Sequence, residues 1–242
     1  CIADGKIYVM GGHLYSPPLF HGGQLYCINA TSGDLIWSSP SFAITNGANC
    51  GISDGYLVVP NAYDNRLYCY GKGQTATTVE APMTAITAED SVVIQGTVTD
   101  QSAGAKGTPA IADDSMSAWM EYLYQQQPMP TNAAGVTVTL DVIDANGNFR
   151  SIGTATSDIS GAFSYMWKPD IPGKYTLIAT FQGSESYYAS YAQTAFGVTE
   201  APAATPTPTP LVLPPYETYT IGAAVAIIIA IAIVGILILR KK

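Results

Sequence analysis

Hydrophobic and polar residues alternate through much of the chain, which predicts half-buried β-strands. The alternation is clearest in residues 136–142, where valine and leucine are separated by threonine and aspartate. Turn residues such as Asn146-Gly147 and Pro172-Gly173 lie between the predicted strands. The other strands of this region are expected at residues 91–99, 149–156, 162–167, 175–181 and 192–198. The predicted fold class is therefore all-β, apart from two helical segments.

The first helical segment lies in an insertion at about residues 101–131. Met116, Trp119, Met120 and Leu123 follow the i, i+3, i+4, i+7 spacing of one helix face. Asp113, Asp114 and Ser115 are expected to cap the start of this helix, and Pro128 and Pro130 to follow its end near Gln127. The apolar face is expected to pack on the protein's own sheet. The alternative is a recognition surface formed by Trp119, Met120, Tyr122 and Tyr124.

The second helical segment, residues 221–239, has neither a charged residue nor a proline. A helix of this length spans about the 30 Å hydrocarbon core of a bilayer. Arg240, Lys241 and Lys242 follow it directly, and such basic clusters stay on the cytoplasmic side. The sequence predicts a single-pass protein of the cell membrane whose main partner is the lipid bilayer, with residues 1–220 outside and residues 240–242 inside.

Small residues recur every four positions in this segment, at Gly222, Ala226 and Ala230. Such a strip allows two helices to approach closely and would support a weak homodimer. The simpler interpretation, which we favour, is that glycine and alanine are common in membrane helices. Upstream, residues 201–220 are rich in threonine and proline and predict an extended stalk.

The N-terminal part contains an internal repeat. Residues 3–9 recur as residues 53–59, and residues 24–28 recur as residues 66–70, with Asp-Gly opening each unit and Leu-Tyr-Cys in its second strand. These units resemble the pyrroloquinoline-quinone-type β-propeller repeat. The resemblance implies that residues 1–73 form the last one or two blades of an incomplete propeller, with Trp37 docking between blades. The second unit lacks the family's Ala-x-Thr-Gly-Trp part.

Residues 74–200, apart from the insertion, resemble the bacterial Ig-like repeat of adhesins and envelope proteins. The motifs that carry this resemblance include Gly161-Ala162-Phe163-Ser164 and Pro172-Gly173-Lys174-Tyr175. The resemblance implies an Ig-like β-sandwich.

The four cysteines all lie in the repeat region, and an even number permits disulfides outside the cell. Cys27 and Cys69 occupy equivalent positions in successive units, which predicts a separation beyond disulfide reach, so both are expected to be buried free thiols. The pattern leaves Cys1 and Cys50 unassigned.

The net charge of −8 argues against a nucleic-acid partner, because binding phosphate requires a concentrated basic surface. His13 and His21 flank one loop but lack further ligands for zinc, and Asp144, Asn146 and Asn148 lack the spacing of a calcium loop. We therefore predict no catalytic, cofactor-binding or metal-binding residue. Asn29 begins an Asn-x-Thr sequon and is a candidate for N-glycosylation.

Two functions follow as hypotheses. The first is a non-catalytic binding or structural protein of the cell surface, which displays the propeller on an Ig-like spacer to an envelope glycan or protein. The second is an anchored propeller enzyme, either a quinone-dependent dehydrogenase or a hydrolase, whose catalytic part lies upstream. The chain resembles a C-terminal fragment of a membrane-anchored surface protein of an archaeal envelope, and we lean toward the non-enzymatic function.

Overall fold

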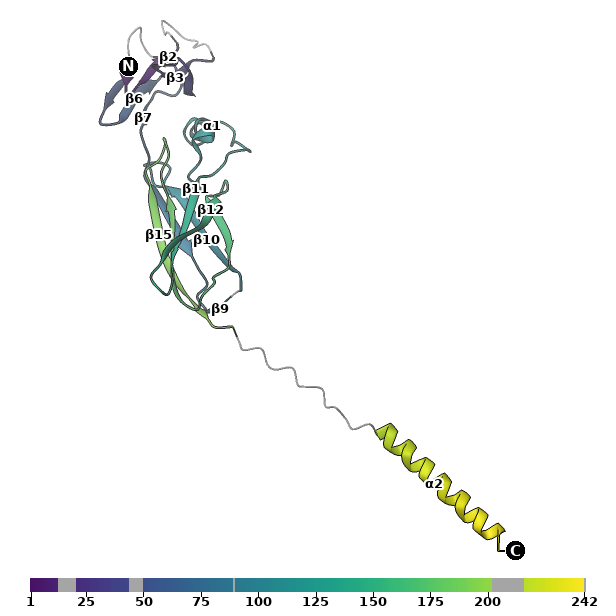
Figure 1. The fold of residues 1–242 in the computed structure, drawn as a ribbon. Coiled ribbons are helices and arrows are strands. Elements are labelled where there is room, and N and C mark those ends of the chain that lie inside the picture. Colours follow the sequence, from purple (N-terminus) through teal and green to yellow (C-terminus); the bar gives the residue numbers. More distant parts are fainter. Residues whose placement is uncertain (13–20, 44–49, 89, 202–215, 242) are drawn as a thin grey trace. The chain divides into compact units, whose positions relative to one another are not determined.

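The structure is a computed structural model that describes residues 1–12, 21–43, 50–88, 90–201 and 216–241. It divides into two compact units, residues 1–201 and residues 202–242. The described part of the first unit is mostly β, and that of the second is a helix (Figure 1). The all-β expectation for the N-terminal unit is therefore correct at the level of fold class, with the single helix of the insertion inside it.

Two small antiparallel sheets form the N-terminal part of the first unit. The first sheet has the strand order β1-β2-β3-β4, and the second has the order β5-β6-β7. Each is a meander, because neighbouring strands in space are also neighbours in the chain. Their bounds are β1 Ile2–Ala3, β2 Lys6–Met10, β3 Gln24–Asn29, β4 Leu35–Pro40, β5 Gly51–Ser53, β6 Tyr56–Asn61 and β7 Arg66–Tyr70.

A three-stranded and a five-stranded sheet follow and pack face to face as a sandwich. One has the order β13-β10-β8 and the other β12-β11-β14-β15-β9. Only β9 runs parallel to its neighbour β15 among the pairs described here. The bounds are β8 Thr75–Glu80, β9 Ile86–Thr87, β10 Val92–Asp100, β11 Thr137–Ile143, β12 Phe149–Thr156, β13 Ala162–Trp167, β14 Gly173–Phe181 and β15 Ser190–Thr199.

The core of the sandwich comes from the period-two alternation of these strands. Along β10, buried and more exposed residues alternate, so that Val92, Ile94 and Val98 face inward. Strand β11 contributes Val138, Leu140 and Val142 in the same way. Aromatic rings fill one part of this core, where Tyr175 stacks on Phe196 with ring centroids 5.7 Å apart. Burying this apolar surface is the main stabilising contribution to the domain.

Helix α1 (Asp113–Gln125) occupies the insertion between β10 and β11. The N-cap residue is Ala112, which makes no side-chain capping bond, and Asp113 and Asp114 lie in the first turn, so the expectation that Asp113, Asp114 and Ser115 cap the helix is wrong. The physical reason is competition: Asp113 accepts hydrogen bonds from a distant loop, and the Ser115 hydroxyl accepts one from the Ala134 amide. The helix ends at Gln126, whose left-handed backbone (φ 56°) closes the last turn before Pro128.

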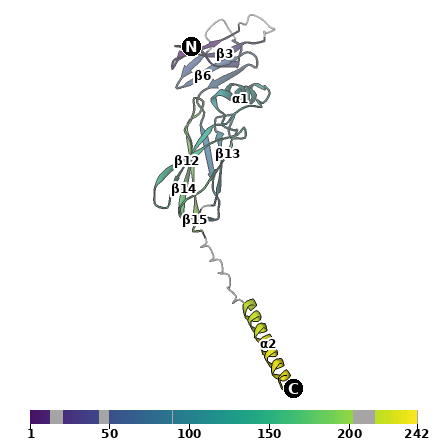
Figure 2. The same cartoon turned by 45° about the vertical axis from the view of Figure 1, so that its right-hand side comes forward.

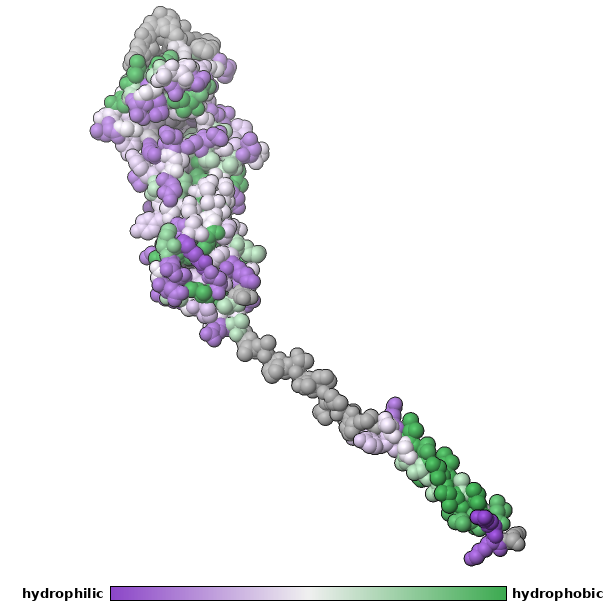
Figure 3. Space-filling view, viewed as in Figure 1, coloured by the Kyte–Doolittle hydropathy of each residue, from purple (hydrophilic) through white to green (hydrophobic). Residues whose placement is uncertain are grey.

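Helix α2 (Tyr216–Leu239) makes up the described part of the second unit and is long and apolar enough to cross a membrane. Its mean hydropathy is 3.1 over the most apolar window, and none of that window is buried. Hydrophobic residues cover most of its visible surface, and hydrophilic residues lie at its two ends (Figure 3). A helix that is apolar on every side and uncovered suits a lipid environment.

Gly96 in the middle of β10 is required by close packing. A Cβ at this position would lie 2.1 Å from the Thr78 carbonyl oxygen and 2.5 Å from the Phe163 ring. We expect Gly96→Ala to lower the free energy of unfolding of the sandwich by about 1–3 kcal/mol, as overpacking does. Gly197→Ala is the matched control, because a Cβ there meets only Ala85 at 3.8 Å. Chemical denaturation of the two variants measures the difference, and equal stabilities would contradict it.

Candidate functional site

The two N-terminal sheets meet at an aromatic seam centred on Trp37 of β4. Its ring stacks on Tyr70 of β7 at 5.3 Å between centroids and lies 6.2 Å from Tyr8 of β2. Beneath these rings, Leu25 of the first sheet is buried in one cluster with Leu57 and Val59 of the second. The structure thus places Trp37 between the two sheets.

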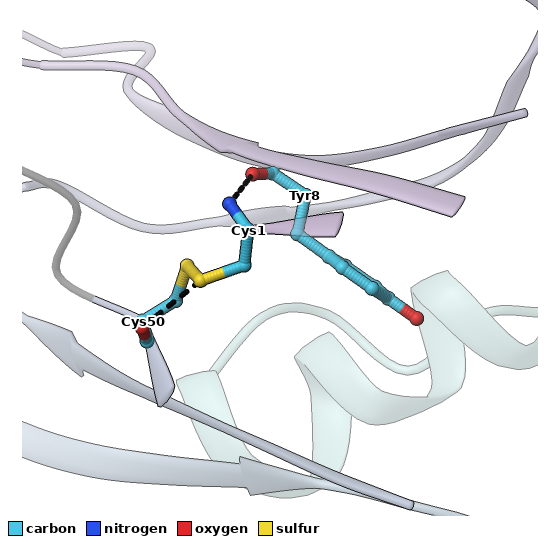
Figure 4. Close-up of a disulfide and its surroundings, with 3 residues drawn as sticks. All are labelled: Cys1, Tyr8 and Cys50. Carbon is cyan, nitrogen blue, oxygen red and sulfur yellow. Dashed lines mark hydrogen bonds between the residues drawn. A yellow bond between two sulfur atoms is a disulfide. The ribbon is translucent and has the colours of Figure 1, made fainter. Parts of the chain in front are cut away.

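A disulfide between Cys1 and Cys50 also joins the two sheets (Figure 4). Cys1 lies beside β2, where its amino group donates to the Tyr8 carbonyl oxygen, and Cys50 directly precedes β5. The bond closes a separation of 49 residues and so restricts the unfolded chain strongly. This disulfide gives the pairing of the two cysteines whose state the sequence pattern left open.

Cys27 and Cys69 are free thiols, as expected, but only Cys27 is buried. The expectation that Cys69 is buried is wrong. Cys27 lies on the face of the first sheet that packs at the seam, whereas Cys69 lies on the opposite, uncovered face of the second sheet. Burial raises the pKa of the Cys27 thiol, which keeps it protonated and unreactive at neutral pH.

Helix α1 lies between the N-terminal sheets and the sandwich (Figure 2). Polar contacts join its C-terminal end to the seam. The Gln125 amide donates to the Ser39 hydroxyl and to the Pro40 carbonyl oxygen, both at 3.0 Å. The Tyr68 hydroxyl donates to Asp64 at 2.5 Å and lies 3.2 Å from the Tyr124 carbonyl oxygen. Burial, followed by the bond to Asp64, raises the pKa of Tyr68 to about 12, so this phenol remains a donor at neutral pH.

A cavity of about 500 Å³ lies between α1 and the ends of the two sheets, and we call it the junction cavity. Its size falls in the range of small-molecule sites. Amide, phenol and guanidinium groups converge on it, and the Gln125 side-chain oxygen beside it is buried without a hydrogen-bond partner. The polar side chains that line it include Gln24, Asn61, Asp64, Arg66, Tyr124 and Gln126. This arrangement can accept a polar ligand that both donates and accepts hydrogen bonds.

The opposite end of α1 is held by the loop between β14 and β15. The Asp113 carboxylate accepts hydrogen bonds from the Ser184 hydroxyl at 2.9 Å, the Glu185 amide at 3.0 Å and the Ser186 amide at 3.1 Å. The same loop exchanges backbone hydrogen bonds with Gly73, in the linker between the sheets and the sandwich. Linker, helix and sandwich loop are therefore joined at one place.

The residues predicted for a recognition surface are covered to different degrees. Trp119 is 3% exposed and packs on Tyr122, with ring centroids 5.4 Å apart, so it cannot form such a surface. Met120, Tyr122 and Tyr124 are half-buried, and Tyr124 alone among them lines the junction cavity.

The other candidate residues lie in turns and loops. The Asn29 side-chain oxygen accepts hydrogen bonds from the Thr31 and Ser32 amides, which orders the sequon as a turn. Asp144 accepts from the Asn146 and Asn148 amides in the same way. His13 lies outside the described residues, and His21 lines the junction cavity. Within the described part of the chain, no three His, Cys, Asp or Glu residues are grouped for metal binding.

The junction cavity could not be read from the sequence. It combines residues that are up to about a hundred positions apart, and no local motif marks it. The signals nearest to it were the run of glutamines at the end of the predicted helix and the tyrosines of the repeat.

No protein-family model matches the sequence, and the search of curated proteins found no match. Solved structures do show similarity. The CARDB domain of a Pyrococcus furiosus protein, in complex with di-metal ions, is 12% identical with a TM-score of 0.28, over 54% of this chain and 91% of that one. The fibronectin(III)-like modules of Clostridium thermocellum CbhA are 16% identical with a TM-score of 0.33, over 77% of this chain and 90% of theirs. BslA, a bacterial hydrophobin, is 12% identical with a TM-score of 0.25, over 55% of this chain and 98% of that one.

The Asp113 contacts predict a pH dependence of stability. Burial alone would raise the pKa of Asp113, but hydrogen bonds from Ser186, Glu185 and Ser184 lower it below 3.8 in the folded state. A carboxylate with a lowered pKa stabilises the fold above its unfolded pKa, and this contribution is lost as the pH falls through the folded pKa. We expect Asp113→Asn to cost about 1–2 kcal/mol at pH 7, allowing for partial exposure.

The same variant should show a weaker loss of stability than the parent as the pH is lowered from 5 to below 3.8. Asp114→Asn is the control, because Asp114 is exposed and neighbours Asp113 on the same turn. Urea denaturation at several pH values measures both. Identical pH profiles for Asp113→Asn and the parent would exclude the proposed contribution of this carboxylate.

Proposed function

We propose that this chain is a cell-surface protein without catalytic activity, which holds its N-terminal sheets away from a membrane and binds a ligand there. The observation that carries the proposal is helix α2, which is apolar on all sides and is followed by Arg240 and Lys241. Basic residues at one end of a single span favour the cytoplasmic side for that end. Residues 1–201 then lie outside, where a disulfide such as Cys1–Cys50 is stable.

In this proposal the sandwich is an Ig-like spacer and residues 202–215 belong to a Thr/Pro-rich stalk. The N-terminal sheets are blades of the quinoprotein-like repeat type. The four-stranded meander of the first sheet and the position of Trp37 at the seam support this assignment. An archaeal envelope is the setting that the sequence resemblance implies.

We further propose that the junction cavity is where an envelope glycan or a polar segment of a protein partner binds. The cavity offers donors and acceptors at fixed positions, because the amide groups of Asn61 and Gln125 are both held by hydrogen bonds to the Pro40 carbonyl oxygen of β4. Groups held in place in this way lose little freedom on binding.

The second candidate function is an anchored propeller enzyme whose catalytic residues lie upstream of this sequence. The repeat resemblance favours it, since some members of that superfamily are quinone-dependent dehydrogenases. We rank it lower, because the repeat type is shared by many proteins that are not enzymes.

The orientation can be tested with protease. Added to intact cells that make the full chain, protease should release a fragment containing the sandwich by cleavage in the Thr/Pro-rich segment, while a tag placed after Lys242 stays protected. Cells permeabilised before digestion are the control and should lose the tag as well. Loss of the tag from intact cells, with the sandwich protected, would contradict the proposed orientation.

Helix α2 offers a second test, which concerns self-association. Gly222, Ala226 and Ala230 form a strip of small residues that would permit a weak homodimer. If the strip is used, Ala226→Leu should weaken association of residues 216–239 in a bilayer reporter assay by about 1 kcal/mol, the size of ordinary contacts between membrane helices. Ala232→Leu lies off the strip and should have no effect. Equal signals from both variants and the parent would make α2 a simple anchor.

A further inference from the structure

Backbone groups at the junction cavity are already bonded within the protein where β4 ends. The Pro40 carbonyl oxygen accepts hydrogen bonds from the side-chain amides of Asn61 at 3.2 Å and Gln125 at 3.0 Å. Pro40 has no backbone N–H to donate. A peptide that binds by adding a strand needs open backbone groups on an edge strand, and this end of β4 offers none. Side chains are therefore the groups that can recognise a ligand here.

Three polar side chains of the lining are open to a ligand. Within the described part of the chain, the side chains of Gln24, Arg66 and Gln126 make no hydrogen bond or ion pair to the protein. A primary amide offers two donors and an acceptor in one plane, and a guanidinium adds further donors. Each hydroxyl of a sugar both donates and accepts, so neighbouring hydroxyls can meet one amide at two points. Tyr63 and Tyr124 also line the cavity, and tyrosine rings offer apolar surface to the less polar faces of a sugar.

The charges of the lining favour an uncharged ligand. Asp64 and Arg66 are its only Asp, Glu, Lys or Arg residues among those described, so their formal charges cancel. The Asp64 carboxylate accepts from the Tyr68 hydroxyl and, at 3.2 Å, from the Arg66 backbone amide, which holds it in place. An anionic ligand that reached the guanidinium would also meet this carboxylate. The net charge of −8 on the whole chain adds no attraction for an anion.

We propose that the junction cavity binds an uncharged oligosaccharide, whose hydroxyls bond to Gln24, Arg66 and Gln126. This inference rests on the proposed function, which assigns a ligand to the cavity, and it narrows that ligand to one chemical class. Gln24 belongs to β3, Arg66 belongs to β7, and Gln126 directly follows α1. A bound sugar therefore bridges both N-terminal sheets and the helix, and it stabilises their arrangement because it binds only the folded junction.

Binding can be measured with the full chain in a detergent that has no sugar headgroup. The array carries three classes of probe: uncharged oligosaccharides of hexoses and N-acetylhexosamines, the same sugars oxidised to uronates, and peptides rich in serine and asparagine. We expect the uncharged sugars to bind. Their Kd should change less than about twofold between about 0.05 and 0.5 M salt, because the contact contains no ion pair. The sugar should be recovered uncleaved, as a non-catalytic role requires.

The most informative variant is Gln126→Gly. Gln126 has a left-handed backbone (φ 56°), which glycine adopts without strain, so this change removes the side-chain amide and keeps the helix end. Asn65→Gly is the matched control, because Asn65 is also left-handed (φ 57°) and lies between Asp64 and Arg66 but does not line the cavity. We expect Gln126→Gly and Gln24→Thr each to weaken sugar binding by about fivefold or more, and Asn65→Gly to leave it unchanged.

The other outcomes separate this inference from the proposed function. If uronates or peptides bind instead, and Gln126→Gly weakens that binding, the cavity remains a ligand site and the uncharged sugar is wrong. If no probe binds to a chain that unfolds cooperatively on heating, both the sugar and the assignment of a ligand to this cavity are wrong, whereas the orientation across the membrane is tested separately by protease. Equal sugar binding by Gln126→Gly, Gln24→Thr and Asn65→Gly would place the sugar elsewhere and overturn the proposal.

Discussion

A β-sheet has two faces, and apolar residues on either face must be removed from water if the sheet is to be stable. In the sandwich this requirement is met because the inner faces of its two sheets cover each other, and their buried residues form one cluster that extends from Val79 to Val198 in the sequence. In the described part of the N-terminal region it is met where the two sheets face each other, with Trp37 between them. Much of what distinguishes the two halves of the first unit follows from this difference.

The junction around α1 shows how the two halves are held together without a large apolar contact. Gln125 binds the end of the first sheet, Asp113 binds the loop between β14 and β15, and that loop binds the linker at Gly73. Polar contacts of this kind depend on direction, so they fix orientation more than they add stability. They also leave a polar cavity between the elements that they connect, and this is why the candidate site and the domain junction coincide.

The sequence was a good guide where one local periodicity decides the structure. Strands β12 and β13 have the predicted bounds, because alternating residues and glycine turns allow little else. A local periodicity does not show when a side chain bonds to a residue far away in the chain instead of to its own helix. Asp113 has the type and position of a capping residue, but its carboxylate binds a loop more than seventy residues away. Trp119 lies on the predicted apolar face, yet only the tertiary structure shows that it is buried.

The cysteines illustrate the same limit. Their spacing placed Cys27 and Cys69 at equivalent positions, and both are free. Equivalent positions do not imply equivalent surroundings, because the seam covers the face of Cys27 and leaves that of Cys69 open. The bond between Cys1 and Cys50 depends on how the two sheets approach each other, which no local pattern specifies.

The path of the chain through the sandwich determines how it would respond to a pulling force. The hydroxyls of Thr75, at the start of β8, and Ser190, at the start of β15, lie 2.7 Å apart, so the chain enters the sandwich where β15 begins. It leaves at Thr199, at the far end of that ten-residue strand. Tension between the two ends therefore acts along β15 and shears its antiparallel ladder with β14, which runs from Ser190 to Val198. Hydrogen bonds loaded in shear must fail together rather than one at a time, so the sandwich is built to remain folded under tension.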